Sequence, residues 1–213
     1  MRYLDVVFAA FYVYAVSMTD NDNGVNINSM RHTYHHGDLR ASLVSVGLEI
    51  LKLRTADDLS LREVARSVGV SATAVYRHFP DKQALLHALC EEGRAMLAEA
   101  QRVAMAASGG GQKGFDATGL AYVHFALANP SLFRLMAKTQ PPREGGTPAG
   151  NVAMQVLQSN VAAILPKSAT ARQRQARAVR AWSLVHGVAM LLLDGRIPHD
   201  EKLIADVIRE PKA

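Results

Sequence analysis

Cysteine is nearly absent from this chain of 213 residues, because Cys90 is the only one. A single thiol excludes an intrachain disulfide and a cysteine-based zinc site, and it suits a reducing compartment, so we expect a cytoplasmic protein. Three histidines at positions 32, 35 and 36 lie in a basic arm, but no carboxylate or cysteine completes a metal-ligand set with them. We predict no metal site.

The sequence also lacks the common enzyme motifs. It contains no H-E-x-x-H, no G-x-S-x-G and no paired carboxylates. An all-helical enzyme could use His124, His186 or Asp194, but no motif connects them. The glycine-rich stretch 108–114 lacks the preceding strand and the G-K-[ST] ending of a phosphate-binding loop. We therefore predict no enzymatic activity and no cofactor.

Long apolar runs are missing as well. The longest, residues 6–16, has eleven residues, whereas a membrane-spanning helix needs about 20. Residues 19–29 are polar and rich in Asn and Asp, as a disordered linker is. We predict that residues 1–30 are a disordered or mis-assigned N-terminal extension, with Met18 or Met30 as the working start, and no membrane partner. A signal peptide or a membrane-surface anchor is the alternative.

The basic charge is unevenly distributed. Residues 31–102 carry ten Lys and Arg against nine Asp and Glu, and residues 103–213 carry 13 against seven. Bulk basicity is therefore no argument for nucleic-acid binding by the first of these segments. Binding there must come from a few directed contacts, which a dimer would double.

Residues 60–82 predict a helix-turn-helix. Ser60 and Glu63 form a capping box, and Leu61, Val64, Ala65 and Val68 give the following helix one apolar face. Gly69 is able to take positive φ and to turn the chain. Ser71 caps a second helix over residues 72–79, on which only Val75 and Phe79 look buried. A small residue, a turn glycine and an inward valine at these offsets are typical of the motif.

The second helix exposes short or hydrogen-bonding side chains. Thr73 offers a hydroxyl and a methyl group to base edges, while Tyr76, His78 and Lys82 can reach phosphates, as can the N–H groups of the helix that begins near Pro80. The alternative is that Tyr76 and His78 cover a packed helix pair. The predicted DNA-binding residues are Ser60, Ser71, Ala72, Thr73, Ala74, Tyr76, Arg77, His78 and Lys82.

The stretch V-S-A-T-A-V-Y-R-H-F-P-D-K-Q-A-L-L resembles the DNA-binding signature of the TetR/AcrR family of bacterial transcriptional regulators. The similarity extends back through R-E-V-A-R-S-V-G-V and covers about residues 34–88. It implies a homodimer with an N-terminal DNA-binding domain and a larger helical domain that binds a small effector. It also implies that Thr73 and Ala74 lie near bases and that Tyr76, His78 and Lys82 contact phosphates.

The remaining pattern predicts an all-α fold with two domains. A helix capped by Asp38 should cover the helix-turn-helix with Leu39, Leu43, Val46, Ile50 and Leu53. The predicted C-terminal helices span residues 80–107, 115–128, 131–138, 152–165, 169–193 and 200–209, with loops at 108–114 and 139–150. We assign residues 31–80 to a three-helix DNA-binding domain and 81–213 to a helical ligand-binding and dimerisation domain.

A second resemblance lies in A-W-S-L-V-H-G-V-A-M-L-L, which is similar to the effector domain of a TetR subgroup named for its Trp, His and Gly, here Trp182, His186 and Gly187. An effector pocket would be lined by Tyr122, Phe125, Met136, Met154, Trp182, His186 and Met190. The favoured alternative makes Trp182 a core residue, gives His186 a buried hydrogen bond, and uses Gly187 for close helix approach.

A run of basic residues lies at the start of the helix predicted over 169–193. Arginines at 172, 174, 177 and 180 suggest a solvated face, and the alternatives are binding of an acidic effector or an extra DNA contact.

The helices predicted at 169–193 and 200–209 are our choice for a dimer interface in the form of a four-helix bundle. Two-fold symmetry would present two recognition helices to a palindromic double-stranded DNA operator. The sequence thus predicts a ligand-responsive repressor with a small-molecule effector of unknown identity. The alternative is an effector-independent activator or architectural factor.

Overall fold

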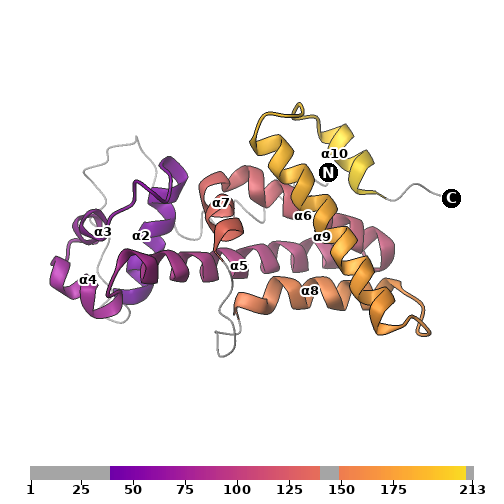
Figure 1. The fold of residues 1–213 in the computed structure, drawn as a ribbon, viewed down its shortest axis with the longest axis horizontal. Helices are drawn as coiled ribbons and strands as arrows, with labels where there is room; N and C mark the ends of the chain where they lie inside the picture. Colours follow the sequence, from indigo (N-terminus) through magenta and orange to yellow (C-terminus); the bar gives the residue numbers. More distant parts are fainter. Residues whose placement is uncertain (1–38, 140–148, 210–213) are drawn as a thin grey trace.

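The chain is helical throughout the part that the structure describes. The structure is a computed structural model that describes residues 39–139 and 149–209, with only the backbone described for 149–155. Within these ranges all regular secondary structure is helical, which confirms the predicted all-α fold (Figure 1). The helices are α2 (Leu39–Leu53), α3 (Leu61–Val68), α4 (Ala72–His78), α5 (Lys82–Ala107), α6 (Gly111–Ala128), α7 (Pro130–Lys138), α8 (Ala149–Ile164), α9 (Ala171–Leu193) and α10 (Glu201–Ile208).

The predicted extension over residues 1–30, the histidine-rich arm and the Asp38 cap lie outside the described residues. Helices α2, α3 and α4 gather at one end of the molecule, around the first turns of α5 (Figure 1). Their inward side chains, among them Leu43, Val64 and Val75, are fully buried. These short helices are stable because each buries one apolar face against its neighbours.

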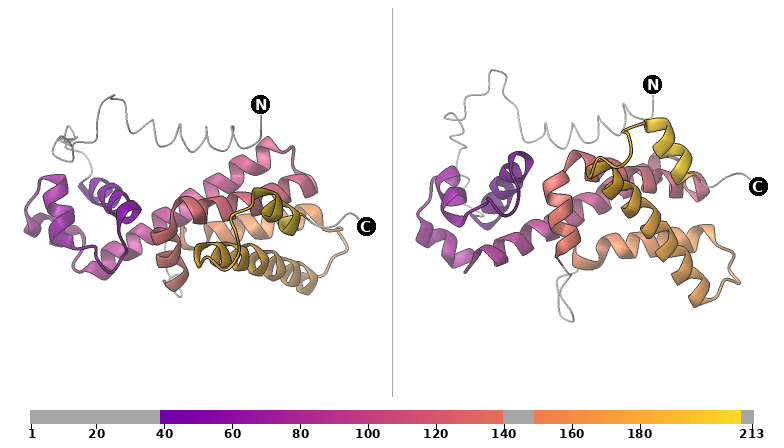
Figure 2. Two further views of the ribbon diagram at one scale, coloured as in Figure 1. Left: turned by 90° about the horizontal axis from the view of Figure 1, so that it is seen from above. Right: turned by 45° about the horizontal axis from the view of Figure 1, so that its top comes forward.

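Helix α5 runs from this end into the rest of the molecule (Figures 1 and 2). It has 26 residues and is therefore about 39 Å long. The Asp81 carboxylate caps it by accepting the Ala84 amide N–H at 2.8 Å. Two glycines let other helices approach closely. A Cβ on Gly47 of α2 would lie 2.8 Å from Leu89 Cδ2, and one on Gly93 would lie 2.7 Å from Met136 Sδ of α7.

Helices α6 to α10 pack around the second half of α5. Helix α6 lies between α5 and α9, α8 lies along α5, and α7 contacts both α5 and α2. Arg134 of α7 donates to the Asp194 carboxylate at 2.5 Å and to the Leu193 carbonyl at 3.0 Å, at the end of α9. His124 of α6 lies 3.0 Å from the Glu201 carboxylate of α10. These contacts hold the helical domain together around a core with Phe125 at its centre, fully buried.

Two sequence-based helix boundaries were wrong. The predicted break at 108–114 is shorter, because α6 begins at Gly111 rather than 115. Positive φ values at Gly109, Gly110 and Gly111 complete the turn, and Gly114 lies inside the helix, where it packs against the Met105 side chain. Helix α8 begins at Ala149, inside the loop predicted over 139–150.

The buried face of α2 also differs from the prediction. Leu53 is 85% exposed, whereas the buried residues are Leu43, Val44, Gly47 and Leu51. At 100° per residue, this face is rotated by roughly a quarter turn from the predicted stripe. Gly47 lies on the buried face, and its missing side chain lets Leu89 of α5 pack closely against α2 there.

Helices α9 and α10 expose an apolar face. Its residues are Val179, Trp182, Leu184, Leu191, Leu203 and Val207, each at least 40% exposed. Gly187 lies between Leu184 and Leu191 on the same side of α9, and no atom of the described chain would lie within 4 Å of a Cβ there. Of the described helices, α9 alone has the length and hydropathy of a membrane span, and 22% of that window is buried.

Candidate DNA-binding surface and effector site

The turn between α3 and α4 has the predicted caps and turn glycine, but the capping box predicted for Ser60 and Glu63 is only half formed, because the Glu63 carboxylate binds Arg54 instead. Ser60 Oγ accepts the Glu63 amide N–H at 3.2 Å, and Ser71 Oγ accepts the Ala74 amide N–H at 3.2 Å. Gly69 adopts φ 81°, and its amide donates to carbonyls in the last turn of α3. The Glu63 carboxylate accepts a hydrogen bond from Arg54 at 2.9 Å. Local capping and one left-handed glycine therefore fix the angle between the two helices.

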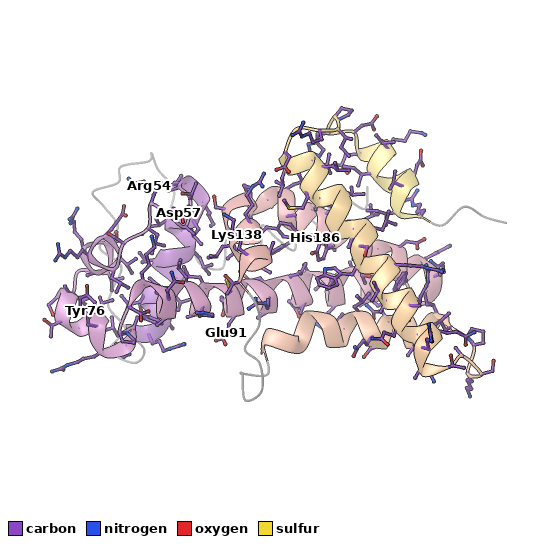
Figure 3. All side chains as sticks on the ribbon, viewed as in Figure 1. Arg54, Asp57, Tyr76, Glu91, Lys138 and His186 are labelled. Atoms are coloured by element: carbon purple, nitrogen blue, oxygen red, sulfur yellow. The ribbon has the colours of Figure 1, made fainter. Side chains whose placement is uncertain are left out.

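Helix α4 presents a polar face to solvent. Val75 and Phe79 are buried, as predicted, whereas Thr73, Tyr76, Arg77 and His78 are exposed. Ala72 and Ala74 are half-buried, and Ser60 and Ser71 are exposed with their hydroxyls engaged as caps. Figure 3 shows Tyr76, 48% exposed, at the outer end of this part of the molecule and far from His186. This face is therefore accessible to solvent.

Two cations beside α4 are held by the protein. Lys82 Nζ donates to the Asp57 carbonyl at 2.6 Å, so a phosphate contact would have to replace that bond. The Arg40 guanidinium of α2 lies 5.3 Å from the centre of the Phe79 ring, within cation–π distance. Arg40 was not singled out in the sequence as a residue beside α4. Arg40 and Phe79 are 39 positions apart and meet only in the folded chain.

Four rings from three helices form an aromatic cluster in the helical domain. Tyr122 of α6 and His186 of α9 are joined by a 3.0 Å hydrogen bond between the hydroxyl and Nδ1. The Phe133 ring of α7 lies 5.5 Å from both ring centres, and the Trp182 ring lies 6.3 Å from His186. Burial raises the pKa of the Tyr122 hydroxyl, and a hydrogen bond with Trp182 opposes that shift. The tautomer of His186 decides which of the two groups donates in the bond between Tyr122 and His186.

Of the residues predicted to line an effector pocket, the structure brings only Tyr122, Trp182 and His186 into this cluster. Phe125 is fully buried, while Met136 and Met190 lie half-buried at the edge of the core. Met154 lies in α8 where only the backbone is described.

The alternative for the Trp, His and Gly set is confirmed in part for His186, which makes a hydrogen bond that is only partly buried. It is wrong for Trp182, which is 45% exposed. It is also wrong for Gly187, because no helix of the described chain approaches it.

Two matches to protein families decide where this fold belongs. Residues 43–89 match the family described as bacterial regulatory proteins, tetR family, and residues 115–209 match the family described as tetracyclin repressor-like, C-terminal domain. The chain belongs to the TetR family. It is a DNA-binding transcriptional regulator, and α3 and α4 form its helix-turn-helix.

Solved structures agree with this assignment. A protein of unknown function from Rhodococcus sp. RHA1 is 32% identical, with 83% of this chain and 93% of that chain covered and a TM-score of 0.67. A tetR-family transcriptional regulator from Streptomyces coelicolor is 24% identical over 79% of this chain and 76% of its own, with a TM-score of 0.59. A TetR variant from Acinetobacter baumannii AYE, in complex with minocycline, is 17% identical over 80% and 89%, with a TM-score of 0.57. The last two show the fold alone.

The aromatic cluster of this TetR family regulator should make its stability depend on pH. Burial lowers the pKa of His186 below its ordinary value of 6.5. The unfolded chain therefore takes up the proton first as the pH falls, so stability present above pH 6.5 is lost below it. In urea denaturation between pH 7.5 and 5.5, His186→Gln should reduce this loss, whereas His87→Gln, at an exposed position of α5, should not. Equal pH dependence in all three proteins would contradict the prediction.

Proposed function

We propose that this TetR family regulator is a ligand-responsive repressor that binds a palindromic operator as a homodimer. In this proposal residues 31–80 form the DNA-binding domain, and residues 81–213 bind an effector and dimerise. The observation that carries the proposal is the exposed apolar face of α9 and α10, because it supplies a second copy with a surface to bury.

The DNA contacts follow from the exposed face of α4. Thr73 and the small Ala72 and Ala74 allow the backbone to approach base edges. Tyr76 and His78 point outward and would donate to phosphate oxygens, and Arg77 adds a charge. Lys82 would exchange the Asp57 carbonyl for a phosphate, which is the stronger acceptor because it is charged.

The dimer contact follows from the two sides of α9. Its inner side, with Val185, Val188 and Ala189, is buried against the rest of the chain, and its outer side carries the exposed apolar residues. Two apolar sides explain the high hydropathy of α9 without a membrane. Gly187 would let the partner's helix approach closely, and a two-fold axis would pair α9 and α10 with their copies in a four-helix bundle.

Repression and its release require that a ligand bind one dimer geometry better than the other. A ligand bound among α5 to α9 would favour a spacing of the α4 helices that does not fit successive major grooves. A regulator that works in this way acts where the DNA is, and we place it in the cytoplasm.

Fluorescence anisotropy of the full chain with labelled DNA from upstream of its own gene tests the proposal. We expect saturation at two chains per site and weakening by Tyr76→Ala. A metabolite screen should then yield a compound that releases the DNA. Tight binding that no compound weakens would instead support an effector-independent activator or architectural factor, and binding no tighter than to unrelated DNA would contradict the operator.

Lys82→Gln should make operator binding less sensitive to salt. Each phosphate contact contributes about 0.9 to the slope of log affinity against log salt concentration, and a dimer has two copies of Lys82. The slope should therefore fall by about two, measured by anisotropy between 50 and 200 mM salt, a range over which phosphate contacts are strongly weakened. Lys202→Gln, whose lysine is exposed on α10 and paired with Asp206, is the control and should leave the slope unchanged. An unchanged slope in Lys82→Gln would show that this lysine makes no phosphate contact.

A further inference from the structure

Three residues with polar or charged side chains are buried in the described part of the chain: Arg94, Gln101 and Thr118. Two of them, Arg94 and Gln101, lie on one side of α5. Thr118 is satisfied, because its hydroxyl donates to the Phe115 carbonyl at 2.7 Å. Arg94 and Gln101 are seven residues apart, which places them on one side of α5, two turns or about 10 Å apart.

Arg94 is a buried cation without a paired anion among the described residues. Its side chain is 8% exposed, and its guanidinium donates to the Thr139 carbonyl at 2.8 Å. No carboxylate in the described ranges forms an ion pair with it. A guanidinium has five N–H donors, and a buried charge that lacks a counter-charge is costly to fold around.

Gln101 and Asn160 each leave a buried atom unsatisfied. Gln101 is 7% exposed, and its Oε1 has no hydrogen-bond partner; neither has Asn160 Nδ2 on α8. Helices α5 and α8 pack against each other. One of these atoms accepts a hydrogen bond and the other donates one, so a single hydroxyl or carboxamide group could satisfy both.

The side chain between the two polar positions on α5 is small. Ala98 is buried and lies four residues after Arg94 and three before Gln101, so it is on the same side of the helix. A hydrocarbon chain that joined the two polar positions would therefore pass a methyl group and no larger side chain. A water molecule would satisfy Gln101 and Asn160 but would not balance the charge of Arg94.

We propose that the seam between α5 and α8 binds an elongated organic acid, with its carboxylate against Arg94 and a second polar group against Gln101 and Asn160. The acid would supply a counter-charge and hydrogen bonds that no described residue provides. This inference rests on the proposed function only in taking the bound acid as the effector. Binding itself needs no DNA and is tested without it.

Three probes of equal length distinguish the contribution of Arg94 from that of Gln101 and Asn160. They are octanoate, 8-hydroxyoctanoate and 1,8-octanediol, whose eight-carbon chains match the spacing of about 10 Å on α5. We expect isothermal titration calorimetry of the full chain to give the tightest binding for 8-hydroxyoctanoate and weaker binding for octanoate. The uncharged diol should bind about tenfold more weakly than the hydroxy acid, or worse, because hydrogen bonds to a charged group are the strong ones.

Arg94→Met should weaken both acids at least tenfold and leave the diol unaffected. The melting temperature of the free variant should not fall, because a buried charge has been removed. Arg102→Met is the matched control, since Arg102 is an exposed arginine of the same helix, paired with Glu99. Gln101→Leu should abolish the preference for 8-hydroxyoctanoate over octanoate. If Arg94→Met does not fold, Arg94→Lys keeps the charge without the planar fork and should still favour acids over the diol.

The inference is overturned if Arg94→Met binds the acids as the wild type does, if the diol binds as tightly as the acids, or if no acid binds at millimolar concentration. Anisotropy with operator DNA separates these results from a failure of the proposed function. A protein that binds the operator but no acid overturns only the inference. If the protein binds the acids but they do not release it from operator DNA, the proposal that they are effectors is overturned.

Discussion

Replacing Gly187 with leucine is expected to leave each protomer folded and to abolish the dimer. The position is open within the described chain, so the new side chain has no clash there. Glycine is also destabilising inside a helix compared with most other residues, so its replacement by leucine should not weaken α9. In the proposed dimer the leucine meets the partner's α9. Overpacking costs about 1–3 kcal/mol at each site, and a two-fold interface contains the substitution twice. Dimer affinity should fall about a hundredfold or more.

Analytical ultracentrifugation over a concentration series measures this effect, and circular dichroism checks the fold. Operator binding should weaken in parallel, because a single α4 reads one half-site. Gly187→Ala, which adds one methyl group, should have a smaller effect, and Ser159→Leu, at an exposed position of α8, should have none. A Gly187→Leu protein that remains dimeric would show that the close contact between protomers lies elsewhere.

Phe125→Ala should lower the free energy of unfolding by about 3–5 kcal/mol, the usual loss for a fully buried phenylalanine. The side chain is completely inaccessible, and its removal leaves a cavity in the main hydrophobic core. Because domains are stable by only about 5–15 kcal/mol, the variant should be largely unfolded in much less urea than the wild type.

Urea denaturation at one fixed protein concentration gives the comparison, since dimerisation also contributes to stability. Leu53→Ala, at a position that is 85% exposed, is the control and should change the free energy of unfolding by no more than about 0.5 kcal/mol. The experiment also separates two roles for Phe125. If it lined an open pocket, as the sequence suggested, the loss would be small, because its side chain would already contact solvent.

The helix-turn-helix was predictable because its determinants are local. Ser60, Gly69 and Ser71 act on atoms within five residues of themselves, and Val75 needs only the preceding helix to be buried. The family resemblance rests on the same short stretch, which explains why sequence reasoning placed α3 and α4 well. Their DNA contacts stay predictions.

The C-terminal helical domain was less predictable because its determinants lie far apart in the sequence or, in the proposed dimer, on another molecule. Gly114 counts as a helix breaker until its neighbour, the Met105 side chain, is known. Gly47 similarly turns α2 toward Leu89 in a way that hydrophobicity cannot show. Trp182 and Gly187 were assigned to the interior of one chain, whereas the structure leaves both at the surface. The pattern of one sequence does not distinguish a residue buried in a protomer from one that a dimer would bury.

The length of α5 has a geometric consequence for the spacing of the two α4 helices in the proposed dimer. Gly93, where α7 crosses α5, lies eleven residues from Lys82, so about 16 Å of helix extends from the crossing to the DNA-binding end. A tilt of about 10° around that crossing displaces the end by about 3 Å. Two-fold symmetry doubles the displacement to about 6 Å, close to two base-pair steps of DNA at about 3.4 Å each. In the repressor that we propose, a small change of angle would therefore be enough to lose the match to the operator.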